Sequence, residues 1–115
     1  MTIKECYEKI GGDYEAVFQR MMKKDALIIK FAKKFLDDSS YTNLKDNLGS
    51  GNVEEAFRAA HTLKGVAQNL GFEKLYKPSS ELAEILRAGS MEGIDGLMDT
   101  ITEEYEKTIM AIKEL

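Results

Sequence analysis

Apolar residues recur at helical spacing along most of this 115-residue chain. Residues three and four positions apart share one face of an α-helix, so a stripe with this spacing must be buried against another element. The clearest stripe consists of Ala56, Ala60, Leu63, Ala67 and Leu70. The period-two alternation of a half-buried strand is not sustained anywhere in the sequence. The pattern therefore predicts an all-α protein.

The composition agrees with a helical fold. The chain has one proline and no tryptophan, and it is rich in Ala, Leu, Glu, Lys and Met, which are strong helix formers. Several methionines fit the apolar stripes, and we expect them to fill the core. They are Met21, Met22, Met98 and Met110.

Capping signals divide the chain into helices. Thr2 and Glu5 form a capping box for a first short helix that ends at Gly11-Gly12, and Asp13 can cap a second short helix. Longer helices are predicted over residues 26–37, 41–48, 52–70, 72–88 and 94–112. Pro78 falls inside one of these patterns, where it lacks a backbone N–H. We expect it to lie in the first turn of its helix or to kink that helix.

These helices predict an antiparallel up-down four-helix bundle. Amphipathic helices joined by short loops typically pack in this way, because each of them must bury one apolar stripe. We place the bundle at residues 26–113 and short additional helices, which flank it, at residues 1–24. The length fits a single domain over residues 1–115. No repeat, low-complexity tract or Pro/Ser-rich linker divides the chain.

The scarcity of reactive side chains excludes several kinds of site. The single cysteine, Cys6, cannot form an internal disulfide, and with the single histidine, His61, it cannot build a Cys/His zinc cluster. We therefore predict no metal site. A catalytic triad with a histidine base would have to be built around His61.

Charge and hydropathy limit the partners and the location. The net charge of −4, from 16 basic and 20 acidic residues, gives no sign of a nucleic-acid-binding surface. No apolar run approaches the roughly 20 residues of a membrane span, and the N-terminus has no signal-peptide core. We expect a cytoplasmic protein that binds neither nucleic acid nor membrane.

His61 projects from the middle of the helix predicted at residues 52–70, away from its inward stripe. The residues near it on the same face are Arg58, Lys64, Gly65 and Gln68. A histidine in such a place is usually a surface residue without a special role. Gly65 argues against that interpretation, because a mid-helix glycine costs about 1 kcal/mol relative to alanine. Its missing side chain, one turn from the imidazole, would let the backbone of another protein come close.

A short motif around this histidine is typical of one family. The residues Ala60-His61-Thr62-Leu63-Lys64-Gly65, followed by Gly71, resemble the A-H-x-L-K-G-x5-G signature of histidine-containing phosphotransfer (HPt) domains. The flanking segments Phe57-Arg58-Ala59-Ala60 and Phe72 with Leu75 also resemble this family, as does the helical order. The next helix departs from the family pattern of a small residue followed by Leu-Glu. Near those places stand Ser79, Leu82 and Ala83, beside Pro78.

The resemblance implies roles for five residues. His61 would accept a phosphoryl group from an aspartyl phosphate on a receiver domain, or give it to one. Lys64 and Gln68 would stabilise the phosphoryl group or shape the site, and Arg58 and Gly65 would take part in partner docking. The implied partners are receiver domains of response regulators or hybrid histidine kinases. The chain would need no cofactor, with Mg²⁺ on the receiver only, and would be a phosphoryl carrier and substrate rather than an enzyme.

The chemistry of the residues is consistent with this role. A free imidazole is mostly neutral at pH 7 and has a lone pair, so it can attack phosphorus without a general base. Phosphoryl transfer asks mainly for in-line positioning and neutralisation of oxygen charge. Lys64 can supply one positive charge. Gln68, two turns along the same face, can hydrogen-bond the imidazole or the phosphoryl group.

Two alternatives remain open at this point. The first domain of a chemotaxis-type histidine kinase is similar to this chain, and its histidine is phosphorylated by an attached ATP-binding domain. A helical protein-interaction adaptor, in which His61 is never phosphorylated, is the other. A kinase dimerisation helix is disfavoured, because Thr62 follows His61 where that family has a glutamate.

Overall fold

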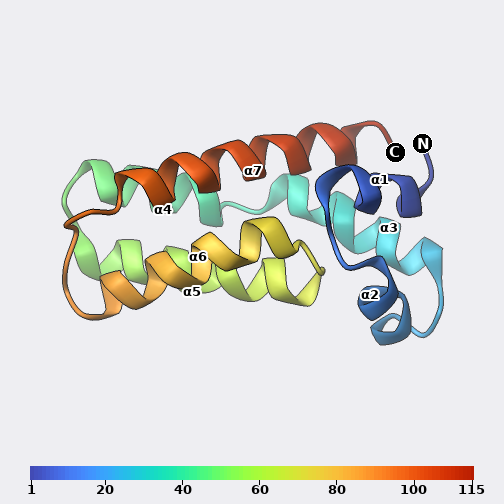
Figure 1. Cartoon of the computed structure of the whole chain (residues 1–115), viewed down its shortest axis with the longest axis horizontal. Coiled ribbons are helices and arrows are strands. Elements are labelled where there is room, and N and C mark those ends of the chain that lie inside the picture. Colours follow the sequence, from blue (N-terminus) through green and yellow to red (C-terminus); the bar gives the residue numbers. More distant parts are fainter.

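The computed structural model describes residues 1–115 and contains helices but no strand, which confirms the all-α prediction (Figure 1). One short 3-10 segment, η1, follows the third helix. The elements are α1 (Ile3–Ile10), α2 (Tyr14–Arg20), α3 (Asp25–Lys34), η1 (Phe35–Asp37), α4 (Ser40–Gly49), α5 (Val53–Asn69), α6 (Glu73–Arg87) and α7 (Asp95–Lys113). None of these helices combines the length and the apolar character needed to cross a membrane.

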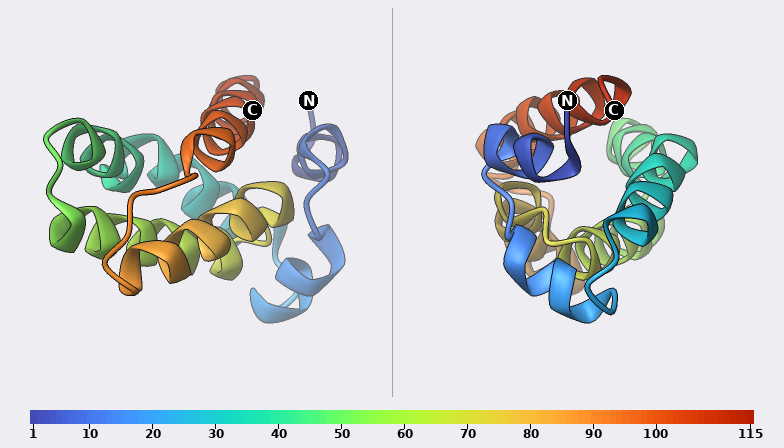
Figure 2. Two further views of the ribbon diagram at one scale, coloured as in Figure 1. Left: turned by 60° about the vertical axis from the view of Figure 1, so that its left-hand side comes forward. Right: turned by 90° about the vertical axis from the view of Figure 1, so that its right-hand side faces the viewer.

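The long helices run along the longest axis of a molecule that measures 40 × 23 × 21 Å. In Figure 1, α4, α5, α6 and α7 follow one another in alternating directions. Helix α5 packs against both α4 and α6, and α6 also packs against α7. Seen along the long axis, the helices surround a common centre (Figure 2). The helix that carries His61 is therefore held on both flanks by its neighbours.

One side of the bundle is built from two helices in succession. Helix α3 and η1 lead into α4 along the same side of the molecule (Figure 1). The break lies between the ranges predicted for these helices, at Asp38, Ser39 and Ser40, where a carboxylate oxygen of Asp38 accepts a hydrogen bond of 2.9 Å from the Ser40 N–H. Short polar side chains compete with helical hydrogen bonding in this way and so separate the two helices.

The core is one cluster of 26 buried apolar residues, to which both the N-terminal helices and the bundle contribute. Tyr41 of α4 and Tyr105 of α7 pack against each other at the edge of this core, and their stacked rings have centroids 4.0 Å apart. The Tyr41 hydroxyl also forms a hydrogen bond of 2.8 Å with that of Thr102. Offset-stacked aromatic pairs add to the stability given by burial alone, so these contacts hold α7 against α4.

The capping box predicted for the first helix is confirmed. The Thr2 hydroxyl accepts a hydrogen bond from the Glu5 N–H at 3.1 Å, and the Glu5 carboxylate accepts one from the Thr2 N–H at 2.9 Å. These hydrogen bonds hold the pKa of the Glu5 carboxyl below its usual value. Gly11 ends α1 in the left-handed conformation, with a φ of 66°, which favours glycine.

Pro78 lies neither before α6 nor in its first turn, but in the second turn of one continuous helix. Of the two alternatives expected for Pro78, a first-turn position or a kink, the first is therefore wrong. Pro78 is buried, so packing of its ring in the interior offsets the backbone hydrogen bond that a proline cannot donate. The hydroxyl of the next residue, Ser79, is also buried and has no hydrogen-bond partner.

The expectation that the methionines fill the core is wrong for two of them. Met22 is 67% exposed and Met110 is 66% exposed, whereas Met21 is buried. Met22 lies in the turn after α2 with a left-handed φ of 58°, which directs its side chain away from the stripe of that helix. Met110 lies on the outer face of α7.

The short N-terminal helices lie at one end of the bundle, close to the turn between α5 and α6 and to the C-terminus (Figures 1 and 2). Helix α1 packs against α7, α2 and α3. At the surface, the Lys9 ammonium lies 3.2 Å from the Glu114 carboxylate and joins α1 to the end of α7. Helix α1 thus connects α2 and α3 with the C-terminal helix α7.

Candidate functional site

His61 is the ninth of the 17 residues of α5, and it is exposed. The inward face of α5 is formed by Ala56, Ala60, Leu63 and Ala67, all of them buried, as the stripe predicts. Because His61 points away from that face, its imidazole makes no hydrogen bond and no ion pair within the chain. A ring nitrogen is therefore accessible to a reactant from outside the molecule.

An aromatic ring flanks the imidazole. The ring centroids of Phe57 and His61 are 5.8 Å apart, with an angle of 33° between the planes. Helical side chains lean toward the N-terminus of their helix, which brings His61 toward the residue one turn earlier. Phe57 has a second neighbour, Arg87 of α6, whose guanidinium lies 5.6 Å from the centroid of the Phe57 ring.

Neither of these two neighbours was assigned to the site from the sequence. The spacing of four residues between Phe57 and His61 could have indicated their contact. Arg87 has no such signal, because only the packing of α6 against α5 brings it to this region. The structure thus adds an aromatic ring beside the imidazole and places Arg87 against that ring.

Gly65 leaves an open space one turn beyond His61. A Cβ atom built on Gly65 would meet no atom within 4 Å, so packing inside this chain does not require a glycine there. Lys64, beside it, is half-buried. Its position lets the apolar stem lie on the protein surface while the ammonium group reaches solvent. The surface around Gly65 is therefore free for the approach of another molecule.

Gln68 is exposed on α5, two turns after His61, and its side chain makes no hydrogen bond with the imidazole. Its backbone carbonyl accepts a hydrogen bond of 3.2 Å from Arg20 of α2. The structure thus places Gln68 on the same face as His61 without contact between the two side chains.

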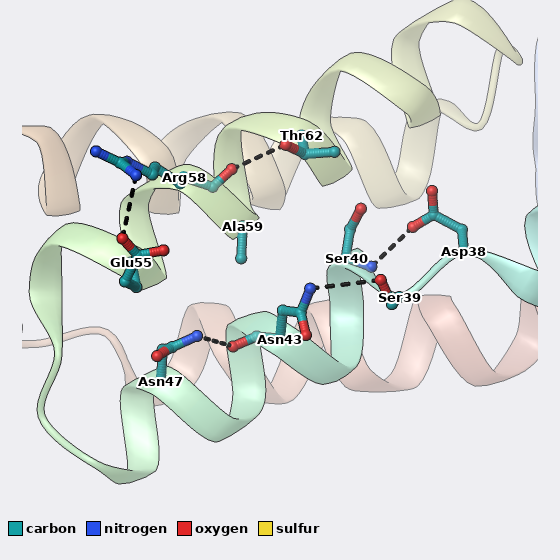
Figure 3. Close-up of a pocket in the computed structure, with 9 residues that line it drawn as sticks. All are labelled: Asp38, Ser39, Ser40, Asn43, Asn47, Glu55, Arg58, Ala59 and Thr62. Carbon is teal, nitrogen blue, oxygen red and sulfur yellow. Dashed lines mark hydrogen bonds and ion pairs between the residues drawn. The ribbon is translucent and has the colours of Figure 1, made fainter.

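Arg58 lies on a different flank of α5. Its guanidinium pairs with the Glu55 carboxylate at 3.2 Å and lines a polar hollow of about 470 Å³ between α4 and α5 (Figure 3). Opposite Arg58 the hollow is lined by residues of α4 such as Asn43 and Asn47. His61 is not among the lining residues, and Arg58 makes no hydrogen bond or ion pair with it.

Comparison with known families decides how this surface is classified. The family model described as Hpt domain matches residues 34–111, which is more than half of the chain and includes His61. The chain belongs to the Hpt domain family. The match confirms the resemblance of the motif at Ala60–Gly65 and identifies this protein as a histidine phosphotransfer domain of two-component signalling. Neither a curated protein nor a solved structure matches the chain.

The Hpt match begins at the last residue of α3 and ends within α7. Helices α1 and α2 thus lie outside the matched segment of this Hpt domain. Within the structure, no group of three or more histidine, cysteine, aspartate and glutamate side chains is arranged to hold a metal ion.

Proposed function

We propose that this Hpt domain is the phosphoryl carrier of a phosphorelay, with His61 as the phosphorylated residue. It would exchange the group with aspartates of receiver domains, in response regulators or hybrid histidine kinases. One observation carries the proposal: the only histidine of the chain is exposed and without a hydrogen bond, beside the open surface at Gly65. The proposed location is the cytoplasm.

The transfer step follows from the chemistry of the imidazole. A ring nitrogen with a free lone pair attacks the phosphorus of an aspartyl phosphate, so that an N–P bond forms as the P–O bond to the carboxyl breaks. The bonding electron pair leaves with the carboxylate, and the reverse reaction returns the phosphoryl group to a receiver. The Mg²⁺ that assists this step would be bound by the receiver, because this chain supplies no ligand cluster of its own.

The residues around His61 would then have separate tasks. The Lys64 ammonium would neutralise charge on the phosphoryl oxygens, since donors and cations at developing charge contribute strongly to transfer rates. Gly65 would let the receiver approach until the reacting atoms are about 3–3.5 Å apart. Gln68 would contact the receiver or the phosphoryl group, and Arg58 would bind the receiver at the edge of the docking surface.

Incubation with receivers that carry radiolabelled aspartyl phosphate tests the proposal. We expect label to leave at least one receiver and to appear on the parent protein, and the His61→Gln variant to leave the receiver's label where it is. A panel of receivers in which none loses label to the folded protein would contradict the carrier role. Equal labelling of His61→Gln would contradict the assignment of His61.

A further inference from the structure

The end of α5 has more carbonyl groups than the helix itself can pair. The last four carbonyls of an α-helix have no partner within it. In this structure the Phe72 N–H donates to the Ala67 carbonyl at 2.9 Å and the Gly71 N–H donates to the Gln68 carbonyl at 3.2 Å. This is a Schellman motif, with Gly71 in the left-handed conformation at a φ of 69°. The motif leaves the carbonyls of Asn69 and Leu70 without a partner.

The N-terminal helices provide those partners. Arg20 of α2 donates to the carbonyls of both Gln68 and Asn69, and Tyr7 of α1 donates from its hydroxyl to the Leu70 carbonyl at 2.5 Å. The positive charge of Arg20 also lies at the negative end of the helix dipole of α5. We call Tyr7 and Arg20 the α5 cap.

The segments that carry the α5 cap fit closely against the turn after α5. The Asp13 N–H donates to the Gly71 carbonyl at 2.9 Å. A Cβ atom at Gly12 would lie 2.9 Å from that carbonyl oxygen, and one at Gly71 would collide with the Val17 side chain. The two backbone segments therefore approach each other so closely that neither Gly12 nor Gly71 has room for a side chain.

We propose that Arg20 and Tyr7 are positioning residues for phosphotransfer, which fix the last turns of α5 from helices that the family model does not include. The inference rests on the proposed function. The receiver must dock over a surface that contains Gly65, and Gln68 lies one turn further toward the capped end. A standard protein interface buries about 800 Å² on each partner, which extends well beyond two helical turns. Fraying of the last turns of α5 would therefore disturb the docked receiver.

The test compares Arg20→Ala with Arg20→Lys, Tyr7→Phe and a control, Lys4→Ala, which removes an exposed charge of α1 that has no partner. Each folded variant is assayed for transfer from a labelled receiver and for phosphorylation by a small phosphoramidate, well below its melting temperature. We expect Arg20→Ala to lose receiver transfer by about tenfold or more, since small displacements of reacting groups are costly. Arg20→Lys should recover part of the rate, and Tyr7→Phe should show a smaller loss.

Phosphorylation by the small donor should stay within about twofold of the parent in all variants, because no docked protein is needed to orient it. Hydrogen exchange should become faster in residues 66–71 of Arg20→Ala and unchanged in Lys4→Ala. Receiver transfer at the parent rate in Arg20→Ala would overturn the inference, and so would equal losses with the receiver and the small donor. A parent protein that takes no label from either donor would overturn the proposed function first and this inference with it.

Discussion

At the scale of single residues, Gly65 is a glycine that packing within the chain does not require. Glycine is a poor helix former, yet nothing in the chain lies within 4 Å of the place a Cβ would occupy. We expect Gly65→Gln to be at least as stable as the parent, by up to about 1 kcal/mol in the free energy of unfolding. The longer side chain should hold a receiver away from His61 and abolish most receiver-dependent phosphorylation, while small phosphodonors should be affected much less.

Gly96 offers a matched control for this prediction. It is also an exposed helical glycine with no atom within 4 Å of its Cβ position, but it lies near the start of α7. Thermal melts and transfer time courses of Gly65→Gln and Gly96→Gln are compared. Normal transfer in Gly65→Gln would show that receivers do not dock on this part of α5.

Lys64 is expected to act on rate more than on stability. Lys64→Ala removes a positive charge one helical turn after His61, so transfer from a receiver should slow by about tenfold or more. Because the stem of Lys64 is half-buried, the loss in unfolding free energy should stay below about 1 kcal/mol. The control is Lys45→Ala, which removes an exposed lysine of α4. Equal transfer rates for both variants and the parent would exclude Lys64 from the reaction.

The residues of the site were only partly predictable from sequence. Helical periodicity was sufficient to place His61 on the outer face of α5 and Gly65 one turn from it. Arg58 was grouped with them because it is three residues from His61, and the structure adds that it pairs with Glu55 and lines the hollow between α4 and α5. Arg87 could not be found at all, because its approach to Phe57 depends on the packing of two helices.

At the scale of the helices, α6 contains a feature that costs stability. The Ser79 hydroxyl is fully buried without a hydrogen-bond partner. Ser79→Ala removes this unpaired group and raises helix propensity, so the unfolding free energy should rise by about 1 kcal/mol or more. Ser80→Ala serves as the control. Ser80 is only half-buried, so this substitution raises helix propensity without removing a buried unpaired hydroxyl. If chemical denaturation finds Ser79→Ala less stable than the parent, the claim that the Ser79 hydroxyl lacks a hydrogen-bond partner is contradicted.

Helix boundaries followed from capping residues more reliably than from apolar stripes. Thr2 and Asp13 each accept the predicted hydrogen bond at a helix start, and Asn52 accepts one at the start of α5. The stripes could not predict where Pro78 lies within α6, because the stabilisation from burying its ring comes from tertiary packing. They also could not show that α3 and α4 lie in succession along one side, which depends on the local geometry at Asp38.

At the scale of the whole molecule, three tyrosines are expected to make stability fall at alkaline pH. The pKa values of Tyr7 and Tyr105 are raised mainly by burial. That of Tyr14 is raised to about 12, mainly by the hydrogen bond that its hydroxyl donates to Asp25. Unfolded tyrosines ionise near pH 10. The folded chain therefore keeps protons that the unfolded chain releases, and their stabilisation is lost as the pH rises from about 10 through the folded pKa values.

Denaturation at a series of pH values up to about 12 tests this dependence. The unfolding free energy should fall above about pH 10, and the fall should be smaller in Tyr14→Phe than in the parent. Tyr76→Phe is the control, because the Tyr76 side chain is half-buried and makes no hydrogen bond. A parent whose stability is constant or rises over this range would contradict the prediction.

The arrangement of the N-terminal helices lay beyond what the sequence could reveal. Their existence followed from capping signals and short apolar stripes, which predicted flanking helices over residues 1–24. Their contact with the end of α5 joins Arg20 to Asn69, 49 positions apart, and no local pattern encodes such a pairing. The bundle could thus be expected from each helix alone, whereas the support of α5 emerges only when all the helices are packed together.

The most direct measurement of the central claim is the chemical nature of the phosphorylated residue. The protein is incubated with a phosphorylated receiver, digested under alkaline conditions and mapped by tandem mass spectrometry. We expect one phosphoryl group, on the peptide that contains His61, which is stable in base, lost in acid and missing from His61→Gln. A phosphoryl group on any other residue, or one that survives acid as a phosphoserine would, contradicts the assignment of His61 as the carrier.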